Sequence, residues 1–84
     1  MIVSFAPGRI RLRFRELKDK SVAALAEARI KETPGIDRVE INPITGSILI
    51  EYDRNILPDE KLLETGRREL AKLNIAFAVP EIPA

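Results

Sequence analysis

The stretch GRIRLRFREL, residues 8–17, alternates cationic and apolar side chains. One parity carries four arginines: Arg9, Arg11, Arg13 and Arg15. The other parity carries three large apolar residues: Ile10, Leu12 and Phe14. Successive side chains of a β-strand point to opposite faces of a sheet, so this period predicts a strand over about residues 9–15. One face of the strand belongs to the core, and the other presents a row of guanidiniums.

Further elements follow on from this strand. Residues 18–35, KDKSVAALAEARIKETPG, indicate a helix that Asp19 or Ser21 caps and that Pro34 and Gly35 end. Two strands are predicted at 36–42 and 47–53, joined by the turn PITG at 43–46. A second helix is predicted within 57–73, with Gly66 permitting close approach to the sheet, and a short last strand within 75–79.

This β-α-β-β-α-β order predicts an α+β fold, a ferredoxin-like βαββαβ sandwich with a four-stranded antiparallel sheet and two helices on one face. We expect a single domain over residues 1–84, with its core at about 9–79 and a tail at 80–84. In such a sheet the first strand lies between the third strand (47–53) and the last (75–79).

Composition excludes several function classes. The 84 residues contain no cysteine and no histidine, which excludes disulfides, thiolate or imidazole metal sites, and Cys or Ser–His nucleophiles. The net charge is only +1, so the arginine row is a local feature. No apolar run approaches the ~20 residues of a membrane span, and no signal peptide is recognisable. We therefore expect a cytoplasmic domain that is not an enzyme and holds no cofactor.

The middle of the chain, ETPGIDRVEINPITGSILIEYD at residues 32–53, resembles the heavy-metal-associated domains of soft-metal chaperones and metal-pumping P-type ATPases. The shared signals are Pro34-Gly35-Ile36, Thr45-Gly46 and Tyr52-Asp53. That family binds metal through a Met-x-Cys-x-x-Cys loop, whose cysteines would fall near Asp19 and Val22 here.

The opening PGRIRLRF, residues 7–14, looks like the cysteine-free second type of heavy-metal-associated domain. Members of this type occur as small proteins and at the N-termini of cation-transporting ATPases. The resemblance implies a role in metal or cofactor handling without the usual ligands.

The arginine row has two interpretations. As a salt ladder, Glu51 and Asp53 neutralise Arg9 and Arg11, while Arg13 and Arg15 lie beside Leu49 and Ser47 on one neighbouring strand and Ala76 and Ala78 on the other. As a site, Arg11, Arg13 and Arg15 bind an anion or a partner together with the apolar Leu49.

The expected partner is another protein, such as a metal-transporting ATPase, or a second copy of this chain. The alternative is a small anion- or nucleic-acid-binding protein that uses the same arginines. Against nucleic acid, Phe14, Tyr52 and Phe77 have the inward parity, so the open sheet lacks aromatic side chains on which bases could stack.

Overall fold

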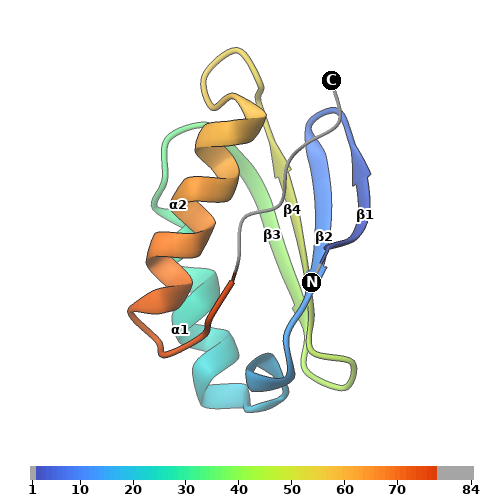
Figure 1. The fold of residues 1–84 in the computed structure, drawn as a ribbon, viewed down its shortest axis with the longest axis vertical. Helices are drawn as coiled ribbons and strands as arrows, with labels where there is room; N and C mark the ends of the chain where they lie inside the picture. Colours follow the sequence, from blue (N-terminus) through green and yellow to red (C-terminus); the bar gives the residue numbers. More distant parts are fainter. Residues whose placement is uncertain (1, 78–84) are drawn as a thin grey trace.

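The computed structural model describes residues 2–77, which form a four-stranded antiparallel sheet with two helices on one face (Figure 1). The elements in chain order are β1 (Ile2–Ala6), β2 (Arg9–Arg13), a short 3-10 helix (Arg15–Lys18), α1 (Lys20–Lys31), β3 (Ile36–Asn42), β4 (Ser47–Tyr52) and α2 (Asp59–Ala71). The strand order is β1-β2-β4-β3. The predicted α+β, ferredoxin-like class is confirmed.

The strand beside β2 on its outer side is β1, not the predicted strand at 75–79. β1 pairs antiparallel with β2 through the two-residue loop Pro7–Gly8, and Gly8 has a φ of +77°. Proline followed by a glycine of positive φ suits such a tight turn. Residues 75–77 form no strand, and residues 78 and 79 lie outside the described part. Ala76 therefore does not flank the arginine row.

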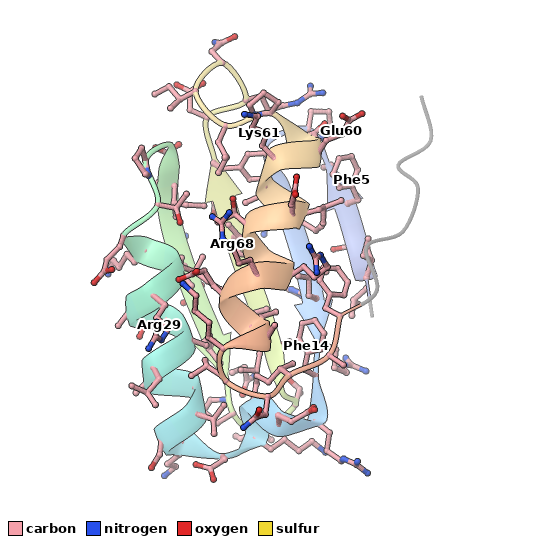
Figure 2. All side chains as sticks on the ribbon, turned by 60° about the vertical axis from the view of Figure 1, so that its left-hand side comes forward. Phe5, Phe14, Arg29, Glu60, Lys61 and Arg68 are labelled. Carbon is pink, nitrogen blue, oxygen red and sulfur yellow. The ribbon has the colours of Figure 1, made fainter. Side chains whose placement is uncertain are left out.

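The core lies between the sheet and the helices, as the alternation predicts. On β2, Ile10 and Leu12 are almost fully buried, and their neighbours on β4, Ile48 and Ile50, are buried with them. Phe14, labelled in Figure 2, packs edge to face on Phe77, with ring centroids 5.4 Å apart. The chain after α2 thereby returns to the core beside the end of β2.

β2 ends earlier than predicted, at Arg13, because the chain there turns into the 3-10 helix. The Phe14 N–H donates to the carbonyl of Gly46 in the β3–β4 turn at 2.9 Å, and the following 3-10 helix buries Leu17. Arg15 consequently belongs to the 3-10 helix and not to the strand.

Two carboxylates organise the helix starts. Asp19 caps α1, since its Oδ1 accepts from the N–H groups of Ser21 at 2.8 Å and Val22 at 3.4 Å. Asp59, the first residue of α2, accepts from the Tyr52 hydroxyl at 2.5 Å and from Arg54 at 3.1 and 2.8 Å. The end of β4 is thus tied to the start of α2.

Gly66 does not have the role predicted for it. A Cβ built at this buried position in α2 meets no atom within 4 Å, so close helix–sheet approach does not require a glycine there. Neither described helix is long and apolar enough to cross a membrane.

Gly46→Ala is expected to destabilise the fold by about 2–4 kcal/mol, because the residue has a φ of +74° and a Cβ would overlap the Phe14 carbonyl oxygen. Gly66→Ala is the matched control, expected to stabilise by about 0.5–1 kcal/mol through helix propensity. Urea unfolding followed by circular dichroism measures both. Similar unfolding midpoints for the two variants would contradict the assigned roles.

Tyr52→Phe is expected to cost about 1–2 kcal/mol at neutral pH, because it removes the hydrogen bond to Asp59. Burial, with the Asp59 carboxylate as a further cause, raises the pKa of Tyr52 above its usual range. The unfolded chain ionises this hydroxyl near pH 10 and the folded chain only above that, so stability falls as pH rises past about 10.

Because Tyr52 is the single tyrosine of the chain, Tyr52→Phe removes this contribution cleanly. Urea unfolding at neutral pH and above pH 10 should show the wild type losing more stability than the variant. An equal loss in both proteins would refute the raised pKa.

Candidate functional site

The sheet surface opposite the helices, here called the open face, is arranged in cross-strand rows. On β2 and β4, Arg9 lies opposite Glu51, Arg11 opposite Leu49 and Arg13 opposite Ser47. Residues directly opposite in an antiparallel pair share one face of the sheet. The arginines of β2 therefore all lie on the open face, as predicted.

β3 and β1 complete these rows. On β3, Arg38, Glu40 and Asn42 lie opposite Glu51, Leu49 and Ser47. On the other side, Ser4 of β1 lies opposite Arg11 and Ala6 opposite Arg9, with a register shift between Ile2 and Ser4. The open face thus combines arginines, glutamates, small residues and one leucine.

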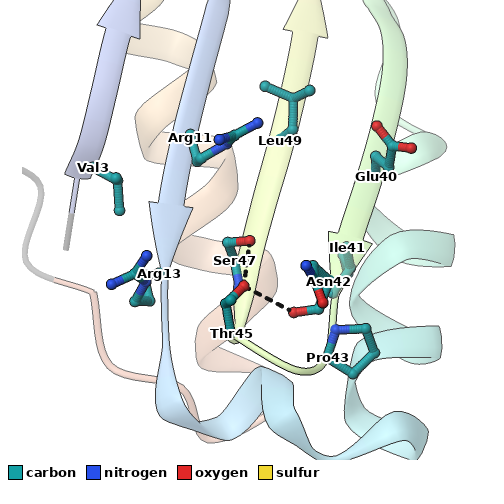
Figure 3. A pocket seen from close by; sticks show the side chains of 10 residues that line it. All are labelled: Val3, Arg11, Arg13, Glu40, Ile41, Asn42, Pro43, Thr45, Ser47 and Leu49. Carbon is teal, nitrogen blue, oxygen red and sulfur yellow. Dashed lines mark hydrogen bonds between the residues drawn. The ribbon is translucent and has the colours of Figure 1, made fainter.

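A hollow of about 490 Å³ lies on the open face, lined from all four strands and from the β3–β4 turn (Figure 3). Its lining residues are Val3, Arg11, Arg13, Glu40, Ile41, Asn42, Pro43, Thr45, Ser47 and Leu49. The hollow thus places two guanidiniums around an apolar side chain.

Leu49 is one of the apolar residues that line this hollow and is only 8% exposed, although its parity points it away from the core. Its direct cross-strand neighbours are Arg11 and Glu40. Long charged side chains cover apolar surface with their stems, and Figure 3 shows Arg11 extended toward Leu49. Leu49 is therefore covered by side chains that are able to move aside.

The ion pairs of the open face differ from the predicted ladder. Both glutamates pair with Arg38: Nη2 lies 2.9 Å from Glu40 Oε2, and Nη1 lies 3.5 Å from Glu51 Oε1. Within residues 2–77, Arg9 and Arg11 form no ion pair. The predicted neutralisation of Arg9 and Arg11 by Glu51 and Asp53 is wrong. Arg38 on the edge strand pairs with the Glu51 carboxylate, and Asp53 Oδ1 accepts from the N–H of Asn55.

The charge balance of these rows is positive. Arg9, Arg11, Arg13 and Arg38 stand against Glu40 and Glu51, so four cations against two anions leave an excess of two positive charges. The chain as a whole has +1. The open face is therefore more cationic than the rest of the chain taken together.

Hydroxyl groups form the end of the hollow next to the β3–β4 turn. Thr45 Oγ1 and Ser47 Oγ are 2.8 Å apart, and Thr45 Oγ1 donates to the Asn42 carbonyl at 3.4 Å (Figure 3). The Asn42 side-chain oxygen accepts from the N–H of Ile44 at 3.0 Å. These bonds hold the turn in shape and place polar oxygens beside the row that contains Arg13.

Of the four residues predicted as a partner or anion site, the structure brings three to the hollow: Arg11, Arg13 and Leu49. Arg15 does not line it, since it lies in the 3-10 helix beyond the end of β2. The predicted placement of Arg13 and Arg15 beside Leu49 and Ser47 is wrong, and Arg11 and Arg13 hold those places.

The sequence does not predict the other residues that line this hollow, among them Val3 and the turn residue Thr45. The Pro7–Gly8 pair was the available signal for Val3, because it indicates a hairpin that brings residues 2–6 beside β2.

The positions where the resemblance places the family's cysteines have structural roles here. Asp19 caps α1, and Val22 packs half-buried against the core. No group of three or more His, Cys, Asp or Glu side chains that could hold a metal ion occurs in the part of the chain that the structure describes.

Comparison with known proteins gives one family. The sequence model described as heavy metal associated domain 2 matches residues 1–74 of the 84. No curated protein and no solved structure matches. The family match spans every strand and helix of the fold.

The wild-type chain is expected to bind neither Zn²⁺ nor Cu⁺ tightly, because it has no thiolate or imidazole ligand. Native mass spectrometry of protein purified without added metal, and then after addition of each ion, measures this. The double variant Asp19→Cys with Val22→Cys is the matched comparison, expected to gain one bound ion. Equal loading of both proteins would show that oxygen ligands suffice.

Proposed function

This chain belongs to the heavy metal associated domain 2 family, and on that premise we propose that it is a non-catalytic module that docks a partner protein through its open face. The family points to metal or cofactor handling as the setting. A partner such as a metal-transporting ATPase fits that setting.

The observation that carries the proposal is the pairing of guanidiniums with an apolar side chain around one hollow. Protein-binding surfaces are enriched in arginine, and their strongest contacts are anchors that fill pockets. Leu49 supplies the apolar contact, and Arg11 and Arg13 supply donors on the same side of the hollow.

Charge defines the kind of partner. Guanidiniums bind carboxylates with two parallel hydrogen bonds, and the sheet rows of the open face carry four arginines against two glutamates. A partner that presents an acidic side chain next to an apolar one matches both features. Arg15, beyond the end of β2, extends the cationic surface toward the 3-10 helix.

The chemistry around the hollow supports a role without catalysis. Glu40 is held in an ion pair with Arg38, and the hydroxyls of Thr45 and Ser47 are hydrogen-bonded to each other. The whole sequence has no cysteine or histidine to act as a nucleophile or a proton shuttle at neutral pH.

The second candidate is binding of an inorganic or nucleic-acid phosphate by the same arginines. The hydroxyls of Thr45 and Ser47 beside Arg13 favour it, because phosphate oxygens accept from both groups. Phosphate contacts release counterions, so affinity for nucleic acid falls steeply with salt. The affinity of a protein that docks through arginines and an apolar contact falls less as the salt concentration rises.

The double variant Arg11→Gln with Arg13→Gln is expected to weaken partner binding about tenfold or more, as loss of charge-assisted hydrogen bonds does. Glu40→Gln should strengthen it, since it removes an anion from the hollow. Arg67→Gln, at an exposed position on α2, is the matched control and should change nothing.

Binding is measured with proteins captured from the source cell on the immobilised wild type, each then titrated by calorimetry at low and physiological salt. Wild-type affinity in the double variant for every captured protein would refute docking on the open face. A steep loss with salt, together with binding of a labelled oligonucleotide, would replace the partner protein with nucleic acid.

A further inference from the structure

The outer edge of β1 is the feature that the proposed function leaves unused. β1 is an edge strand of the sheet, and within residues 2–77 no strand pairs with its outer side (Figure 1). Its sequence, IVSFA, has no charged residue, and Val3 and Phe5 are 43% and 38% exposed. An uncharged apolar edge strand is a template for pairing with another strand.

The opposite edge of the sheet is protected. β3 has three charged residues, Asp37, Arg38 and Glu40, and Arg38 is engaged with two glutamates. Charges on an edge strand oppose strand addition. The two edges are therefore different, and only that of β1 is suited to pairing.

We propose that β1 pairs antiparallel with β1 of a second copy of this chain, so that the two sheets join into one of eight strands around a twofold axis. A surface that binds itself must tolerate its own charges across the axis. β1 meets this condition because it has none.

The register follows from the faces of β1. Phe5 lies opposite Ile10 and so on the helix side, while Ser4 and Ala6 lie opposite Arg11 and Arg9 on the open face. In the proposed dimer each residue pairs with a residue that points to the same face of the joined sheet. The twofold axis therefore passes through Phe5. The two Phe5 rings become direct cross-strand neighbours, and Ser4 of one copy faces Ala6 of the other. Aromatic cross-strand pairs favour such contacts.

The arginine rows do not oppose this arrangement. Three strand spacings separate β2 of one copy from β2 of the other, about 14 Å in all. The Debye length at physiological ionic strength is about 8 Å, so the two rows repel each other only weakly. The small residues on this side of β1, Ser4 and Ala6, also leave room for a neighbouring strand.

The pairing is weak because β1 has only five residues. Such an edge buries less area than the roughly 1,200 Å² at which stable interfaces begin, which is typical of transient complexes. The chain should therefore be in a monomer–dimer equilibrium whose dimer fraction rises with protein concentration.

Sedimentation equilibrium of the wild-type chain, from about 10 μM to about 1 mM, tests this range of affinities. A monomer–dimer equilibrium is expected. Phe5→Lys should raise its dissociation constant at least tenfold, because it places like charges directly opposite each other. Ile44→Lys, at an 86% exposed apolar residue in the β3–β4 turn, is the matched control and should leave the equilibrium unchanged. Thermal melts show whether each variant is folded.

Disulfide cross-linking gives a second test that does not depend on stability. The chain has no cysteine, so single-cysteine variants react only at the chosen position. Phe5→Cys should form a covalent dimer under mild oxidation at least ten times faster than Ile44→Cys, even though position 44 is the more exposed.

A chain that remains monomeric throughout the range would overturn the proposal, and so would equal cross-linking at the two positions. Slow hydrogen exchange, in a monomer, of the β1 amides that point away from β2 would show that the edge is covered within one chain. Dimerisation that protects β3 would assign the other edge. Both results contradict pairing through β1. None of them bears on docking at the open face, which the Arg11 and Arg13 variants test separately.

Discussion

The central strand β2 constrains the rest of the structure, because both of its edges and both of its faces are used. Its backbone pairs with β1 on one side and β4 on the other. Ile10 and Leu12 fill the core, and Arg9, Arg11 and Arg13 occupy the open face. The hydrogen bond from Phe14 to Gly46 then fixes where this strand ends, and with it which arginines lie on the sheet and which lie beyond it.

The fold class followed from the sequence because alternation and helical spacing both report burial against one core. β3, β4 and both helices lie close to the predicted ranges, and Asp19 caps α1 as its residue type suggests. β1 was not predicted, since residues 2–6 have no charged residue to mark an alternation. The sequence instead predicts a strand at 75–79 in the place beside β2 that β1 occupies.

The charges of the candidate site were harder to predict than its position. The alternation along β2 predicts that its arginines lie on the open face. It does not predict whether Glu51 pairs with Arg9 on β2 or with Arg38 on β3. Which arginine pairs with Glu51 depends on side-chain geometry across three strands. The alternation of residues along a single strand carries no information about that geometry. The burial of Leu49 under its charged neighbours has the same origin.

Leu49 is already largely out of water before any partner arrives, with Arg11 extended toward it. A partner that displaces this arginine exchanges one apolar cover for another, so little new apolar surface leaves the solvent at this point. Apolar burial is what makes the heat capacity of a complex lower than that of its separate components. Leu49 itself would therefore add little to the heat-capacity change of a complex formed at the open face.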